Sequence, residues 1–158
     1  MQRKLPSHMI KYYEALGCVA DGRIQMGAVD EAIHATVLSS DRTKTYDVSY
    51  DQDTNAIMSN DNSSYWKEEL GYPALALLLF LDRLDYQGQY GDMLVDIAWK
   101  KLNTKNNNDR DLTQDMVDDE ISSRGQNVNA LHTYCKELMK RVEEMKLQFL
   151  GSKQLPAK

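Results

Sequence analysis

Few side chains in this sequence have the type and spacing of a catalytic or binding site. The densest group of polar and aromatic residues lies at 61–66. This segment reads Asp-Asn-Ser-Ser-Tyr-Trp, which combines a carboxylate, hydroxyl groups and two aromatic rings. With the strand residue His34, Asp61 and Tyr65 would form an acid–base site if one cleft brought them within hydrogen-bond reach. Alternatively, a partner protein would contact the segment at Asp61, Asn62, Tyr65 and Trp66. In a purely structural role, the polar groups would cap a helix and the rings would cover the core edge.

The other nucleophiles and metal ligands form no catalytic pattern. The spacings Cys-x-x-Cys and His-x-x-x-His, which are typical of metal sites, do not occur, and neither does the phosphate-loop sequence Gly-Lys-Ser/Thr. Cys18 and Cys135 are expected to be small core residues. The acidic run over 111–120 suits the first turns of a helix better than a cation site. We therefore expect no catalytic residue, no metal and no cofactor, and the protein is not expected to be an enzyme.

Length, charge and apolar patterning restrict the class of protein. The chain has 158 residues, of which 42% are hydrophobic and 27% charged, and its net charge is −5. Residues 1–60, 61–110 and 111–158 carry 6, 6 and 7 basic residues against 8 acidic residues each, so no segment is basic and nucleic-acid binding is disfavoured. The longest apolar run is far shorter than the ~20 residues of a membrane span. Two cysteines and no signal peptide favour the cytoplasm.

Hydrophobic periodicity predicts the elements that position these residues. Between residues 23 and 60 the period is 2, which is typical of strands, whereas on either side it is near 3.6, which is typical of helices. The predicted strands are 33–38 and 45–50, which form a hairpin, and 56–59. Four helices are predicted over 9–20, 73–84, 92–102 and 128–149, the first with Ser7 as its N-cap. A short helical turn is expected after a cap at Ser63 or Ser64. A further helix is expected to begin at Thr113 and to be weakened or ended at Gly125.

The last predicted helix carries a heptad seam. Apolar residues recur at alternating spacings of 3 and 4 over three heptads, namely Val128, Leu131, Cys135, Leu138, Val142, Met145 and Phe149. Two arrangements satisfy this pattern: the helix leaves the domain and pairs with its copy as a coiled coil, or it folds back onto the apolar helix at 73–84. We expect a homodimer in which this helix and the domain surface both contribute.

The segment 44–51, which reads Lys-Thr-Tyr-Asp-Val-Ser-Tyr-Asp, resembles the strand of a SWIM zinc finger, which often reads KTYxVxxD. In that family a Cys-x-Cys pair follows on the next strand and a Cys-x-His pair opens an apolar helix. The matching positions here are Met58, Asn60, Gly71 and Pro73, and none of these side chains binds zinc as a thiolate or imidazole. The resemblance therefore implies a ββα unit without zinc. Because SWIM domains are associated with binding DNA or protein, it also implies one of these two binding functions. An unrelated hairpin followed by helices would show the same spacing.

Together these patterns predict an α+β fold with an N-terminal helix, a small antiparallel sheet of three or four strands and a helical C-terminal part. The expected organisation is an α+β domain at 1–103, which contains the SWIM-like unit at 23–84, then a helical region at 111–150 and a tail at 151–158. We expect a non-catalytic intracellular interaction module that binds a protein and associates with itself. A nucleic-acid-binding protein and an enzyme with a site near 61–66 are the alternatives.

Overall fold

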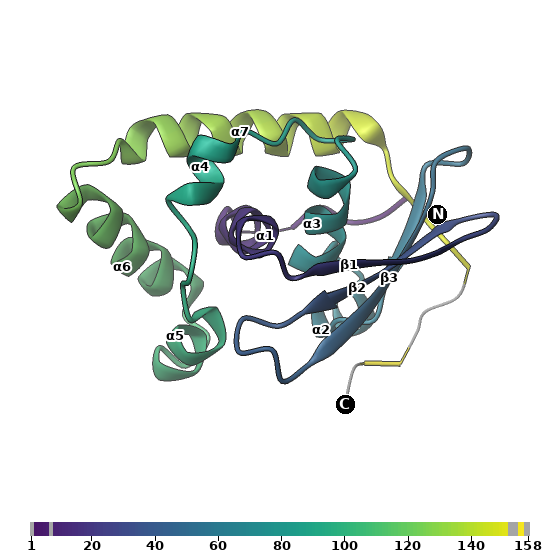
Figure 1. Ribbon diagram of the computed structural model, residues 1–158, viewed down its shortest axis with the longest axis horizontal. Coiled ribbons are helices and arrows are strands. Elements are labelled where there is room, and N and C mark those ends of the chain that lie inside the picture. The colour runs from purple at the N-terminus through teal and green to yellow at the C-terminus, as the bar shows by residue number, and fades with distance from the viewer. Residues whose placement is uncertain (1, 7, 152–154, 157–158) are drawn as a thin grey trace.

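The structure has the predicted α+β order, in which one helix is followed by strands and then by helices (Figure 1). It is a computed structural model that describes residues 2–6, 8–151 and 155–156. In these residues the helices are α1 (Ile10–Ala20), α2 (Asn62–Trp66), α3 (Tyr72–Phe80), α4 (Gly88–Asp92), α5 (Trp99–Lys105), α6 (Arg110–Ser123) and α7 (Val128–Met145). The strands are β1 (Ile24–Val29), β2 (Ile33–Leu38), β3 (Thr45–Asp51), β4 (Ala56–Ser59) and β5 (Gln148–Phe149).

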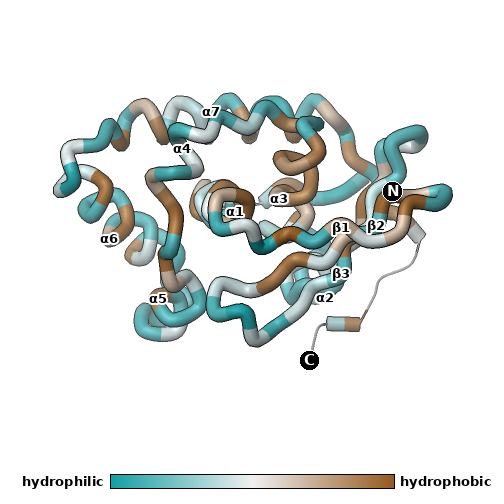
Figure 2. The backbone as a smooth tube through the Cα atoms, viewed as in Figure 1, coloured by the Kyte–Doolittle hydropathy of each residue, from teal (hydrophilic) through white to brown (hydrophobic). Residues whose placement is uncertain are grey.

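The centre of the core is α3, whose residues 73–79 are all buried. A helix that is apolar on every side must be covered on every side. Accordingly, α3 packs against α1 and against the inner face of β3 and β4. In Figure 2 most of α3 is coloured as hydrophobic, whereas hydrophobic and hydrophilic residues alternate along α7, which runs along the outside of the helical layer.

The sheet has five strands in the order β1-β2-β3-β4-β5, rather than the three or four that the sequence predicts. The three predicted strands form its antiparallel centre, with Ala35 opposite Val48 and Tyr50 opposite Ile57. The edge strand β1 was not predicted because both of its faces are largely exposed: every residue after Ile24 is exposed, including the apolar Met26 and Val29, so no alternation of apolar and polar residues marks the strand. The short β5 pairs parallel to β4, with Ile57 opposite Phe149.

The prediction of a helix over 128–149 is wrong at its end, because α7 stops at Met145. Lys146 adopts the left-handed conformation with φ 51°. The chain then pairs with two other segments, since Gln148 N donates to Asn55 O (3.0 Å) and Arg3 N donates to Leu147 O (2.7 Å). These long-range hydrogen bonds replace those of a continued helix, and sequence periodicity carries no information about them.

Other predicted boundaries also shift. The helix predicted over 92–102 is interrupted between α4 and α5, where Asp96 has φ 58° and donates its backbone N–H to the Asp21 carboxylate (2.8 Å). The helix α6 is capped by Asp109, four residues before the buried Thr113, which was predicted to open it. The apolar helix ends at Phe80 rather than at residue 84. Ser7, the predicted cap of α1, lies outside the described residues.

The heptad seam packs inside this chain. Leu131, Cys135, Leu138, Val142 and Met145 are buried members of the single core cluster, whereas Val128 and Phe149 are half-buried. The helix is folded back onto its own domain, as in the second predicted arrangement, but its main helix contacts are with α1 and α6 rather than with the apolar helix α3. The same cluster contains residues from both 1–103 and 111–150. Self-association stays a prediction, but a partner could reach the buried seam only by opening the core. Within the described residues no helix is long and apolar enough to cross a membrane.

This use of the seam can be tested at Leu138. Replacing it with alanine leaves a cavity in the core of one chain, so Leu138→Ala should lower the free energy of unfolding by about 2–5 kcal/mol. Glu137→Ala on the exposed face of the same helix should change it by less than about 0.5 kcal/mol. Urea denaturation gives the free energies, and light scattering gives the solution mass. A Leu138→Ala protein of unchanged stability whose mass falls by half would instead place the seam between two chains.

Candidate functional site

The polar and aromatic segment at 61–66 is organised by the buried carboxylate of Asp61. One of its oxygens accepts hydrogen bonds from the hydroxyl groups of Ser59 and Ser64 (2.8 Å to Ser64), and the other accepts the Ser64 backbone N–H (3.2 Å). Asp61 is therefore the N-cap of α2, in place of the predicted Ser63 or Ser64. Three donated hydrogen bonds compensate the cost of burying this carboxylate.

Gly71 completes the cluster because it leaves room for that carboxylate. A Cβ atom at position 71 would lie 2.0 Å from Asp61 Oδ2, well inside van der Waals contact. Gly71 is also the residue from which α3 begins. Position 71 therefore needs a residue without a side chain. Through its contacts with Ser59, Ser64 and Gly71, the Asp61 carboxylate connects the end of β4, the helix α2 and the start of α3.

Arg3 closes the cluster from the N-terminal segment. Its guanidinium group donates to Ser64 Oγ (3.1 Å) and to Glu69 O (3.3 Å), and it lies 4.3 Å from the centre of the Phe149 ring. Burial lowers the pKa of Arg3, and the carboxylates of Asp61 and Glu68 oppose that shift. Arg3 was not predicted as a site residue, because nothing in the sequence of the N-terminal stretch indicates that this side chain is only 4% exposed.

The two rings of the segment differ in exposure, and only one of them is presented to solvent. Trp66 is 71% exposed, whereas Tyr65 is half-buried. The rings meet edge to face with their centres 4.7 Å apart, which is the preferred geometry of aromatic pairs. Asn62 is exposed at the other end of α2. Of the four predicted contact residues, Asp61 is thus buried and Tyr65 half-buried, whereas Asn62 and Trp66 are exposed.

His34 does not join this segment. Its imidazole contacts Ser49 Oγ (2.7 Å) and Asp30 Oδ1 (3.0 Å) on the solvent-facing side of the sheet. His34 lines a shallow depression with Ser49, whereas Asp61 lines a different cleft on the helical side. The acid–base arrangement of Asp61, His34 and Tyr65 that the sequence suggested is therefore not assembled.

A cleft of about 230 Å³ adjoins the N-terminus of α2, and most of its lining was not predicted. Asp61 and Asn62 form one side, and α1, the β2–β3 turn and α5 supply the others. Glu14 is the lining residue that a sequence signal could have identified, because it is the one charged residue in the run 12–18, and the structure buries that whole run. In the part of the chain that the structure describes, no group of three or more His, Cys, Asp or Glu residues is placed to hold a metal ion.

These features define an α+β protein in which a short, polar-anchored helix projects a tryptophan beside a charged cleft. A family model described as Uncharacterised conserved protein UCP014422 matches residues 3–148, so the chain belongs to that family. The match covers the segment that contains Arg3, the strands β1 to β4, the first residue of β5 and the helices α1 to α7. Neither the curated proteins nor the solved structures contain a match to the chain. The resemblance to SWIM domains stays a prediction, because the matched family neither supports nor excludes it.

The steric role of Gly71 gives a direct test of the cluster. Gly71→Ala should force the Asp61 carboxylate out of its hydrogen bonds and lower the free energy of unfolding by about 1–3 kcal/mol. Gly88→Ala is the matched control, because a Cβ atom there meets nothing within 4 Å. Urea denaturation of both variants measures the difference. Equal stability of the two variants would contradict the packing described here.

The buried thiols predict loss of stability in alkali. Burial raises the pKa of Cys18 and Cys135 from 9.0 to about 12. Above pH 9 the unfolded chain releases two protons that the folded chain retains, so stability should fall by roughly 1.4 kcal/mol per pH unit for each thiol. Urea denaturation between pH 8 and pH 10.5 measures the slope, and Cys18→Ala should make it shallower. An unchanged free energy across this range would show that the thiols are accessible to water.

Proposed function

We propose that the protein is a non-catalytic protein-binding module and that a partner protein buries Trp66. The single observation behind this proposal is a tryptophan that is 71% exposed although Tyr65 and the capped helix α2 hold its ring in place. Tryptophan is enriched among the residues that dominate binding energies at protein interfaces. A side chain that is already fixed loses little conformational entropy on binding, so its contribution to affinity is larger.

The surroundings of Trp66 support a binding role rather than catalysis at this segment. Both Asp61 oxygens already accept hydrogen bonds from Ser59 and Ser64. His34 is engaged with Ser49 and Asp30 on another face. The partner we propose is a different protein with an apolar pocket for the indole ring, since the seam that suggested self-association is packed within the chain.

The proposal is tested by placing a photo-cross-linking amino acid at position 66. Phe80, which is 47% exposed at the end of α3, is the control position. We expect one cellular protein to be cross-linked from position 66 and not from position 80. The purified partner should then bind Trp66→Ala at least tenfold more weakly than the wild type, with Phe80→Ala unaffected.

Two results would contradict this function. If the purified partner binds Trp66→Ala as tightly as the wild type, the ring is not an anchor. If position 66 cross-links only to a second copy of the chain, the surface serves self-association instead. Thermal unfolding of Trp66→Ala should match that of the wild type, because an exposed ring contributes little to stability.

A further inference from the structure

The cleft beside α2 combines basic side chains from four separate parts of the chain. Lys11 comes from α1, Lys44 from the β2–β3 turn, Lys100 from α5 and Arg110 from the start of α6. Among the described residues, the carboxylates in the lining are Glu14 and Asp61. In a protein whose net charge is −5, a cleft lined by four cations and two anions is a local reversal of charge. Such a reversal concentrates anions at the site.

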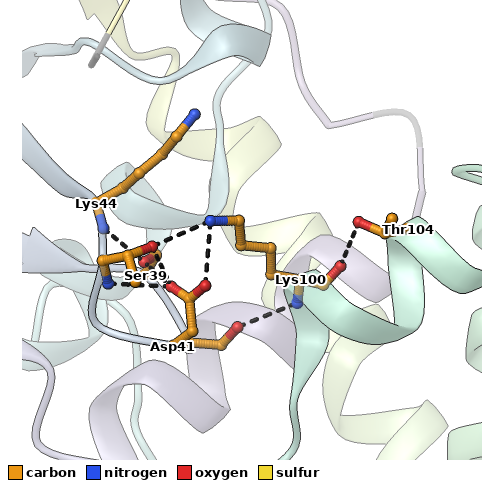
Figure 3. A network of polar contacts seen from close by, with 7 residues as sticks. Ser39, Asp41, Lys44, Lys100 and Thr104 are labelled. Carbon is orange, nitrogen blue, oxygen red and sulfur yellow. Dashed lines mark hydrogen bonds and ion pairs between the residues drawn. The ribbon is translucent and has the colours of Figure 1, made fainter.

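The cations of the cleft differ in whether they are already paired. Lys100 Nζ lies 3.1 Å from Asp41 Oδ2 and donates to Thr43 Oγ1 (3.0 Å). Within the described residues, Lys11, Lys44 and Arg110 make no ion pair. Figure 3 shows the Lys44 side chain extending away from the Asp41 network, with its amino group free of contacts to the residues drawn. Three positive charges are therefore left to a ligand.

The position of Lys44 and Lys100 is fixed by a polar network that joins the β2–β3 turn to α5. Asp41 accepts hydrogen bonds from Ser39 Oγ (2.8 Å) and from the Thr43 backbone and hydroxyl group (3.0 and 2.7 Å). The Lys100 N–H donates to Ser40 Oγ (3.1 Å), and the Lys44 N–H donates to Ser39 Oγ (3.0 Å). The network thus fixes the side chain of Lys100 and the backbone of Lys44, from which the Lys44 amino group extends.

The lining also contains polar groups suited to a second kind of contact. Glu14 is 3% exposed and accepts a hydrogen bond from Asn103 Nδ2 (3.1 Å), whereas the buried Asn103 Oδ1 has no partner within the part of the chain that the structure describes. The buried Trp99 has an indole N–H that is likewise without a partner. Buried polar atoms are normally hydrogen-bonded, so each unsatisfied one calls for an explanation. Oxygen acceptors such as those of Glu14 and Asn103 are suited to hydroxyl groups.

We propose that this cleft binds a small phosphomonoester that also carries hydroxyl groups, such as a sugar or polyol phosphate. The phosphate would lie among Lys11, Lys44 and Arg110, whose ammonium and guanidinium groups match its charge. The hydroxyl groups would donate to Glu14 and to the unpartnered Asn103 oxygen. A cleft of about 230 Å³ has room for a ligand of this size but not for a polymer chain.

The test is calorimetric titration of the full chain with four probes: ribose 5-phosphate, glycerol 3-phosphate, inorganic phosphate and ribose. We expect saturable one-to-one binding of the two phosphomonoesters, at least tenfold weaker binding of inorganic phosphate and none of ribose. Raising the salt concentration should weaken binding of the phosphomonoesters. If inorganic phosphate binds as tightly as both esters, or if none of the probes binds, the proposal is overturned.

Matched variants locate the binding. Lys44→Glu and Arg110→Glu should each weaken ribose 5-phosphate binding at least tenfold, whereas Lys136→Glu, the same charge change at an exposed position of α7, should leave it unchanged. Glu14→Gln should reduce the preference for ribose 5-phosphate over inorganic phosphate. Circular dichroism confirms that each variant is folded. Equal binding by the folded Lys44→Glu and Lys136→Glu proteins would show that the phosphate binds elsewhere.

Discussion

The buried carboxylate of Asp61 is the interaction on which the arrangement of this protein depends most. It accepts hydrogen bonds from Ser59 at the end of β4 and from Ser64 in α2, and its bulk requires a glycine at position 71, where α3 begins. An uncompensated buried charge would cost several kcal/mol, so the strand and the two helices are held in the one arrangement that supplies the donors. Arg3 adds the N-terminal segment to the same cluster. The sheet and the helical layer therefore meet at a polar cluster that lies between the apolar core and the charged cleft.

The sequence predicted the parts of the fold that depend on local periodicity. The alternation in β2 and β3, the apolar run of α3 and the amphipathic pattern of α7 each correspond to an element of the predicted type. The parts it missed depend on contacts between distant residues. The edge strand β1 pairs with β2 without alternating polarity, and β5 forms only because Gln148 and Leu150 donate their N–H groups to Asn55 and Ile57. Neither contact leaves a pattern in the sequence near it.

The same distinction separates the predicted and unpredicted parts of the candidate sites. The composition of 61–66 identified the segment, but it could not distinguish Asp61, which is buried, from Trp66, which is exposed. The cleft was missed entirely, because Lys11, Lys44, Lys100 and Arg110 are far apart in an evenly acidic sequence. In our account α2 lies between two binding surfaces, with Trp66 at its C-terminal end and Asn62 in the cleft lining at its N-terminal end. A ligand in the cleft would contact the helix that presents the tryptophan.

The central claim is that a five-residue helix, too short to be stable alone, is held rigid by its buried polar anchor. Hydrogen–deuterium exchange of the amides in α2 tests this claim most directly. We expect the Ser64 amide, which donates to Asp61, to exchange as slowly as the amides of β4 and only through global unfolding. A Ser64 amide that exchanges as fast as those of an exposed turn would contradict it. In that case α2 would be a mobile loop, and Trp66 would not be a fixed anchor for a partner.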